Sequence, residues 1–440
     1  RGIIKGNLEV AEQRYFAERI GSYLPEISIN ATVPTYGADE RWGYLPGTDE
    51  KRPLRETFLN YKADVTVTQN LITGGDLTAR ADLLSSEGEH PNRTGVQVDE
   101  SSRLGRFSFS LSQPVLQPSQ PKYDLRNRSD DLELARLSRV EEAATLKKEV
   151  VEAFFGVLQS EIGTERGRDE LEKAQLQSDI TSARLADGVV SEEQRLESVA
   201  ALLDAELQLF EYEDNATNQR RTLATLLDAK SLEEIEPVPP KTVQPLDSQT
   251  QQRYLENWEG CIPLMKAKYE FDKQKRTANF TSSSHGLTGS LTANYNMSRG
   301  EVEDAGIADD LRTDSWEVRL DLSYPIWDGG ASGAAVKAAR LSAEQARLEY
   351  EKNEKSVQAE ITALINRLSV SYRKLDVLKQ KISIAQTKLD IAHERMDDGQ
   401  ISKLTYLDSR ISFLEARNKY LDELKTYYSI RVDLESKYLN

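Results

Sequence analysis

The feature that most constrains this chain is a duplication with a constant offset of 211 residues. Residues Arg395–Ser402 read Arg-Met-Asp-Asp-Gly-Gln-Ile-Ser, and residues Arg184–Ser191 read Arg-Leu-Ala-Asp-Gly-Val-Val-Ser. Pro325 and Pro114, each at the end of a Leu-Ser-x-Pro sequence, differ by the same 211 positions. An offset held over a long span without net insertion indicates an internal duplication, and its length exceeds that of a solenoid repeat. Each copy is therefore a whole structural half.

Each half is predicted to contain a shorter helix, a group of strands and two long helices around a glycine turn. Strands are indicated where apolar and polar residues alternate, as Phe107, Phe109 and Leu111 do with the serines between them. In the first half, 1–228, we predict a helix over 2–22, strands over about 26–34, 61–84 and 105–113, and helices over 127–187 and 191–228. In the second half, 251–440, we predict a helix over 251–279, strands over about 287–296 and 316–324, and helices over 333–397 and 402–438.

The remaining segments are predicted to lack regular structure. Four prolines in residues 229–250 indicate an extended linker between the halves. Polar and mixed composition predicts loops over 35–60 and 85–102, and an acidic loop over 301–314.

Composition excludes several classes of protein. A net charge of −16 argues against a basic nucleic-acid-binding face. A hydrophobic fraction of 38% with 30% charged residues suits long, thin, solvated helices better than one thick core. Cys261 is the single cysteine, which excludes an internal disulfide, and the three histidines His90, His285 and His393 are isolated, so no metal or other cofactor is expected.

Membrane association is predicted from the strands rather than from the helices. The sequence has no run of about 18 apolar residues, so no membrane-spanning helix is expected. It starts at Arg1 inside a helical pattern, so a leader that preceded it would lie outside this sequence. Strands of about 8–10 residues with one apolar face are long enough to cross a bilayer when tilted, with lipid outside and water inside. Alternating strands of this length also build soluble sandwiches, but here they connect directly to helices too long for a compact sandwich domain. Too few strands are predicted to close a barrel from one chain, and open edges cannot exist in lipid, so the chain must oligomerise.

These features together resemble the TolC-like outer membrane factors, the exit ducts of tripartite efflux pumps and type I secretion systems. The shared features are the glycine turn followed by serine, the Leu-Ser-x-Pro strand ends, the bend at Asp328-Gly329-Gly330 and the duplication. The resemblance implies a mainly α fold with β: a homotrimer with a β-barrel in the outer membrane and a long α-helical barrel across the periplasm. It places residues 229–250 in an equatorial region. It also implies a periplasmic adaptor (membrane fusion) protein and an inner-membrane pump as partners.

One segment departs from the simplest form of that family. The apparent hairpin at 61–84 is additional to the strands that the family pattern requires. Either the barrel has more than four strands per chain, or this hairpin decorates its outside or top.

The resemblance places the two glycine turns at the periplasmic tip, where they would meet the adaptor. Ser191 and Ser402 occupy the N-cap position of the helix that follows each turn. Side chains beside the glycines are expected to be exposed for docking. The predicted docking residues are Gly188, Val189, Val190, Ser191, Gly399, Gln400, Ile401 and Ser402.

The family places acidic residues of the pore gate one and two turns beyond the glycine. Asp408, nine residues after Gly399, is acidic, whereas Thr405, six residues after it, is not. Gln194 and Glu197 hold the corresponding positions of the first half. A ring of Asp408 carboxylates would attract cations. Charges beside the turns that could tie helices together are Arg184, Asp187, Arg395, Asp397 and Asp398.

No enzyme is predicted. The run Gly329–Gly333 lacks the Lys-Ser/Thr of a phosphate-binding loop, and no Ser-His-Asp, Cys-His or carboxylate pair has supporting context. We therefore predict a passive trimeric conduit of an efflux pump, which exports small molecules. The alternatives are a type I secretion duct for polypeptides with the same fold, and a non-membrane coiled-coil scaffolding protein.

Overall fold

The computed structural model describes residues 2–44, 49, 51–91, 96–229, 237–240, 242–304 and 306–438. It contains two compact units, which are described separately. The sheet unit comprises Lys5–Ala135 and Lys268–Leu348, and the helical unit comprises Arg1–Ile4, Arg136–Ala267 and Glu349–Asn440. Both units therefore draw on both halves of the duplicated sequence.

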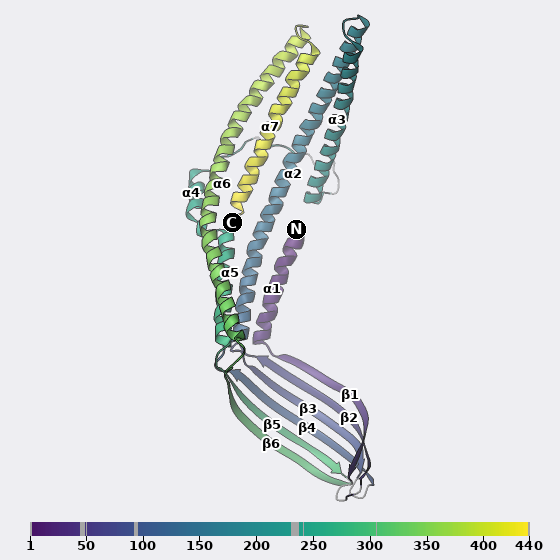
Figure 1. The fold of residues 1–440 in the computed structure, drawn as a ribbon, viewed down its shortest axis with the longest axis vertical. Helices are drawn as coiled ribbons and strands as arrows, with labels where there is room; N and C mark the ends of the chain where they lie inside the picture. The colour runs from purple at the N-terminus through teal and green to yellow at the C-terminus, as the bar shows by residue number, and fades with distance from the viewer. Residues whose placement is uncertain are drawn as a thin grey trace. The chain divides into compact units, whose positions relative to one another are not determined.

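Six antiparallel strands form one sheet in the order in which they occur in the chain (Figure 1). They are β1 (Glu26–Tyr44), β2 (Lys51–Asn70), β3 (Asp76–Pro91), β4 (Gln97–Pro114), β5 (Thr288–Asp304) and β6 (Ile307–Ser323). Every strand is much longer than predicted. The predicted loops over 35–60, 85–102 and 301–314 are wrong, because the described parts of these segments continue the strands. Most side chains of 85–102 and 301–314 are polar, and glycine, proline and charged residues interrupt the apolar residues of 35–60, so regular alternation disappears although backbone pairing continues.

The hairpin predicted at 61–84 lies in the middle of this sheet and not outside it. It is the end of β2 and the start of β3, joined by a turn in which Leu71 donates its backbone N–H to the Gly75 carbonyl at 2.7 Å. The chain therefore contributes six strands, more than the four of the simplest family pattern.

The register gives the sheet one apolar and one polar face. Directly paired residues lie on the same face. One cross-strand row consists of Ile27, Val67, Ala79, Phe109, Tyr295 and Trp316. The next row consists of Ser28, Thr66, Arg80, Ser108, Asn296 and Ser315. The alternation read from separate segments thus produces a continuous apolar face across all six strands.

The long helices agree closely in length between the halves. α2 (Gln120–Ala186) and α6 (Ala331–Asp397) each have 67 residues, and α3 (Glu192–Leu227) and α7 (Lys403–Glu435) have 36 and 33. α2 begins earlier than predicted, because proline is accepted in a first turn and Ser119 Oγ accepts the Lys122 backbone N–H at 3.3 Å.

The shorter helices lie before the strands of each half. α1 covers Gly2–Tyr23. The single helix predicted over 251–279 is instead three pieces: α4 (Ser248–Glu256), the 3₁₀ turn η2 (Trp258–Gly260) and α5 (Ile262–Ser284). In the predicted linker, residues 230–236 and 241 lie outside the described residues, and 237–240 and 242–247 have no regular structure.

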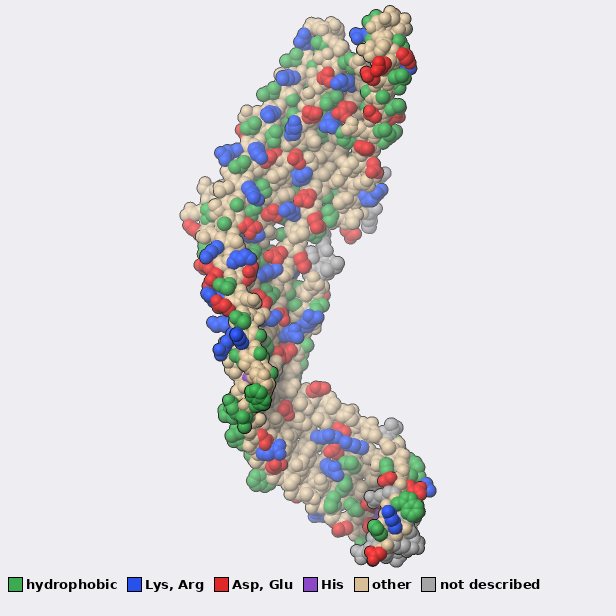
Figure 2. Space-filling view, viewed as in Figure 1, with side chains coloured by type: hydrophobic (Ala, Val, Ile, Leu, Met, Phe, Trp, Pro, Cys, Tyr) green, Lys and Arg blue, Asp and Glu red, His purple; other side chains and the backbone are tan. Residues whose placement is uncertain are grey.

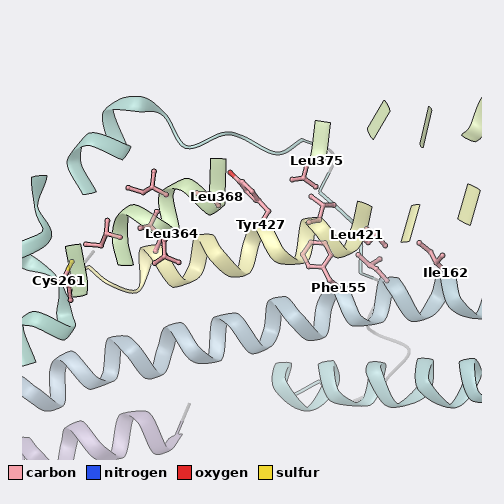
Figure 3. Close-up of a cluster of buried hydrophobic side chains, with 14 of the residues drawn as sticks. Phe155, Ile162, Cys261, Leu364, Leu368, Leu375, Leu421 and Tyr427 are labelled. Carbon is pink, nitrogen blue, oxygen red and sulfur yellow. The ribbon is translucent and has the colours of Figure 1, made fainter. Parts of the chain in front are cut away.

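The core of the helical unit is a seam between α2, α6 and α7 (Figure 3). Phe155 and Ile162 of α2 pack with Leu368 and Leu375 of α6 and with Leu421 of α7. A smaller cluster joins α2 to α3 through Val157 and Leu223. α2 thus lies between α3 and α7, with α6 beyond α7 (Figure 1).

Charge is mixed over the helices. On the face shown in Figure 2, acidic and basic side chains are interspersed along the helical unit. None of the helices in the described residues contains a stretch long and apolar enough to span a membrane.

Candidate functional site

Both glycine turns have the same helix-ending geometry. Gly188 and Gly399 have φ of 72° and 71°, in the left-handed region. After α2, the Val189 N–H donates to the Arg184 carbonyl and the Gly188 N–H to the Leu185 carbonyl, both at 2.9 Å. After α6, the corresponding distances are 2.8 Å from Gln400 to Arg395 and 3.0 Å from Gly399 to Met396. This is the Schellman motif, which favours glycine at its left-handed position.

Serine then starts the next helix in both turns. Ser191 Oγ accepts the Gln194 backbone N–H at 3.2 Å, and Gln194 Oε1 accepts the Ser191 N–H at 3.1 Å, which completes a capping box. Ser402 Oγ accepts the Thr405 N–H at 3.3 Å. Gln194 and Thr405, predicted as gate positions, therefore have a capping role in the chain.

Exposure differs among the predicted docking residues. Val189 is 71% exposed, and Ser191, Gln400 and Ser402 are exposed as well. Val190 and Ile401 are half-buried, contrary to the prediction. Each of these two residues immediately precedes the N-cap serine of the next helix.

The predicted gate residues are not brought together within one chain. Asp408 pairs with Lys173 of α2, with Nζ 2.5 Å from Oδ1. Arg395 Nε donates to Oε1 of the turn residue Gln400 at 3.3 Å, and Gln400 Nε2 donates to Asp398 Oδ2 at 3.5 Å. Asp397 lies 3.8 Å from His393 Nε2, one helical turn earlier. The others, Glu197, Arg184 and Asp187, are exposed.

Besides the Lys173–Asp408 pair, α2 and α7 are joined near the turns by ion pairs of residues that the sequence analysis did not single out. Lys403 of α7 pairs with Glu172 of α2. One heptad further along α7, Arg410 lies 3.3 Å from Glu165 and 3.1 Å from Asp169. The sequence spacing indicates such contacts. Lys403 and Arg410 are seven residues apart, as are Glu165 and Glu172, so each pair shares one face of its helix. We call Glu165, Asp169, Glu172, Lys173, Lys403, Asp408 and Arg410 the α2–α7 ionic ladder.

Asp169 is the buried member of this ladder. It is only 3% exposed, and burial raises the pKa of its carboxyl above the usual range, against the opposing effect of the Arg410 guanidinium. Arg410 Nε approaches Asp169 Oδ2 within ion-pair distance, but that oxygen accepts no hydrogen bond of good geometry. The charge of Asp169 therefore depends on Arg410.

If the turns dock an adaptor, as the resemblance implies, replacing either turn glycine with valine should abolish most export while the oligomer still assembles. A side chain there would meet nothing within 4 Å, so the cost comes from the left-handed backbone alone, roughly 1–3 kcal/mol. Asparagine tolerates this conformation and is the matched control. Export should be compared for Gly399→Val, Gly399→Asn and the same pair at Gly188. Full export in both valine variants would count against the turns as the docking site.

Comparison with known proteins agrees with the fold described above. The model of the outer membrane efflux protein family matches residues 263–436. No curated protein matches the chain in sequence.

Solved structures of similar fold cover nearly the whole chain. The Campylobacter jejuni CmeC outer membrane channel shares 15% identity over 99% of this chain and 82% of its own, with a TM-score of 0.61. The Vibrio cholerae outer membrane protein VceC shares 13% identity over 98% and 90%, also with a TM-score of 0.61. The Neisseria gonorrhoeae MtrE outer membrane channel shares 15% over 99% and 84%, with a TM-score of 0.59. The predicted resemblance to TolC-like outer membrane factors is confirmed.

Proposed function

We propose that the chain is a member of the outer membrane efflux protein family, whose model matches residues 263–436, and that it forms a homotrimeric, passive exit duct of a tripartite efflux pump. The observation that carries this proposal is the two-faced sheet. Phe109 and Leu320 lie on its apolar face, and Ser110 and Thr292 lie on its polar face. A sheet with one apolar and one polar face is suited to lipid outside and water inside.

The polar face carries charges that require water. Arg80 lies 3.1 Å from Asp64 and 2.6 Å from Asp82, and Asn30 donates to Asp64 at 3.0 Å. These side chains come from three neighbouring strands. Such a network would be costly against hydrocarbon, so this face is assigned to the lumen.

The outer helices of the helical unit carry exposed apolar stripes, which support assembly with further copies. α6 exposes Val370, Val377, Ile384 and Ile391, and α3 exposes Leu196, Leu203 and Phe210. Both sets recur every seven residues, the spacing of a helix-packing seam. A second copy of this chain supplies the complementary stripe, since α6 and α3 lie on opposite sides of the four-helix layer (Figure 1).

The duplication gives the contacts of this seam. Adding 211 to the α3 stripe gives Leu407, Leu414 and Leu421 of α7, which are buried within the chain. Subtracting 211 from Ile384 gives Lys173, which contacts Asp408 of α7. In the duplication, α6 corresponds to α2 and α3 corresponds to α7. We therefore expect α6 of one copy to pack against α3 of the next copy as α2 packs against α7 within one chain. This packing would place Ile384 beside Glu197 of the next copy.

This seam predicts opposite effects of two matched charges. Ile384→Lys should preserve the trimer, because lysine would pair with Glu197 of the next copy, whereas Ile384→Glu should weaken it. Exposed pairs of this kind contribute roughly 0.2–1 kcal/mol at each interface. Thermal dissociation of the trimer in detergent measures the difference. Equal behaviour of the two variants would remove Ile384 from the seam.

The gate is proposed to lie beside the two turns. Asp408→Asn should weaken cation selectivity, because in a trimer it removes three carboxylates near the turns and leaves three Lys173 cations without this partner. Arg395→Ala should raise the resting conductance by loosening its turn at Gln400. Both can be measured from single channels in planar bilayers. Unchanged selectivity in the Asp408 variant would leave Glu197 or Asp397 as the next candidates.

The partners and cargo follow from the proposed duct. We propose that the turns dock a periplasmic adaptor protein and reach an inner-membrane pump through it, and that small molecules pass without chemistry in this chain. A type I secretion duct would have the same fold and is the second candidate. Deletion of the gene distinguishes the two: impaired drug export supports the efflux duct, and impaired polypeptide export supports the secretion duct.

Reconstitution tests the proposal against a coiled-coil scaffold. The purified chain should need detergent to stay dispersed and should give ion-conducting steps in planar bilayers. A protein that is monodisperse without detergent and adds no conductance would refute the duct.

A further inference from the structure

We infer that each sheet is one segment of a closed barrel in which β6 pairs with β1 of a neighbouring copy, Leu322 opposite Ile27 and Leu320 opposite Ile29. The inference rests on the proposed trimer and gives it 18 strands, since each chain contributes six. It identifies the partner of the two strand edges as a second copy of this chain and fixes the register between them.

The first observation is a stagger of the strand ends along the rim that holds the β2–β3 turn. Straight across the sheet from Glu26, the first residue of β1, the pairing leads through Thr68, Thr78, Ser110 and Asn294 to Glu317. β6 continues beyond Glu317 to Ser323. The line of strand ends along this rim is therefore displaced by six residues along the strand direction between β1 and β6. Every displacement between neighbouring strands is in the same direction or zero.

The opposite rim shifts in the same sense. β2 starts at Lys51, but its pairing with β3 starts only at Thr57 opposite Glu89. β4 starts at Gln97, but its pairing with β5 starts at Glu100 opposite Asp304. The sheet is therefore sheared as a whole, with both rims inclined together.

This shear is the amount that a membrane barrel requires. The displacement of six residues accumulates over the five steps from β1 to β6. With no further displacement from β6 to β1 of the next copy, the average is one residue for each of the six strands. One residue advances about 3.3 Å along a strand and one strand about 4.8 Å across the sheet, which corresponds to a tilt of about 35°. Barrels with one residue of shear per strand tilt by about 36°, and membrane barrels tilt by about 35–45°. When successive copies continue a sheet with this shear around a closed barrel, the strand ends of all copies lie at the same height along the barrel axis, which we call level rims.

Level rims place the end of β6 beside the start of β1 of the next copy. Ser323 then lies opposite Glu26, both on the polar face, and Leu322 lies opposite Ile27 on the apolar face. The directions also fit, because β1 and β6 run antiparallel in a sheet of six alternating strands. Without a neighbour both edges would leave backbone groups unpaired in lipid.

The barrel that results is wide. Eighteen strands at about 4.8 Å spacing and about 35° tilt give a diameter of about 33 Å between strand axes. The β2–β3 hairpin, central in each sheet, thus enlarges the bore by two strands per copy.

Disulfide scanning tests the register in the assembled protein. In a Cys261→Ala background, Leu320→Cys is combined in turn with Ile27→Cys, Ile29→Cys or Ala31→Cys. Directly opposed strand residues have Cα atoms about 4.5–5.5 Å apart, within disulfide range. Oxidation in outer-membrane vesicles should convert most chains to covalent dimers and trimers only for the Ile29 pair.

The outcomes separate this inference from the proposed function. Covalent dimers and trimers from the Ala31 or Ile27 pair instead would overturn the register, since either result requires a shift of two residues. If no pair gives covalent dimers and trimers in a protein that native mass measurement shows to be trimeric, the edge pairing is overturned. A monomeric Cys261→Ala parent would overturn both the inference and the proposed trimer.

Discussion

Arg410→Ala should destabilise the helical unit by roughly 3–5 kcal/mol at neutral pH, because it leaves a buried carboxylate without its partner. Asp169 is 3% exposed, and Arg410 is the cation within ion-pair distance of its Oδ2. Denaturant unfolding followed by the helical signal measures the loss. Asp169→Asn combined with Arg410→Ala is the matched control and should recover most of it, since no buried charge remains.

The loss should depend on pH in a defined direction. Burial raises the pKa of Asp169, so the folded state binds this proton more tightly than the unfolded chain, whose carboxyl has a pKa of about 3.9. Stability of Arg410→Ala should therefore increase as the pH falls through the raised pKa and decrease as it rises through it. A defect independent of pH would contradict the assignment to Asp169.

Phe109→Arg should cost roughly 2–4 kcal/mol of folding stability in a bilayer, provided that the apolar face meets lipid near mid-membrane. Phe109 lies in a row with Ala79 and Tyr295, in the middle of the sheet. Leu320→Arg should behave in the same way. Folding into vesicles under a urea gradient measures the effect.

The neighbouring residue provides the control for this prediction. Ser110 lies on the opposite face, where its Oγ donates to Asn294 Oδ1 at 2.7 Å. Ser110→Arg should therefore cost much less than Phe109→Arg. Spin labels should report lipid at Ile29, Phe109, Leu291 and Leu320 and water at Ser28, Ser110 and Thr292. The reverse pattern would invert the assigned faces.

Sequence reasoning could locate the turns and the strand cores because each has a local cause. A left-handed glycine followed by a capping serine is encoded within four residues, as at Gly399 and Ser402. Alternation identified Phe107 to Leu111 because one face of that strand is apolar. The outer strand ends, such as Glu301 to Asp304, carry acidic residues on both faces, so pairing with β4 defines them rather than alternation.

The site was harder to predict because its contacts join distant segments. Lys173 and Asp408 are 235 residues apart, and nothing local to either indicates the other. The family resemblance pointed to Asp408 but not to its partner. Arg410 and Asp169 were missed for the same reason, although Arg410 lies seven residues after Lys403 and Asp169 four residues after Glu165, spacings that keep each pair on one helix face.

The equal length of α2 and α6 limits how this protein can change in evolution. Each has 67 residues, which corresponds to about 100 Å of helix. An insertion in one helix alone would displace its glycine turn from the other and shift the heptads out of phase with α7 or α3. Tolerated length changes should therefore come in pairs, one in each half and in multiples of seven residues. The length of these helices would then vary in discrete steps of about 10 Å.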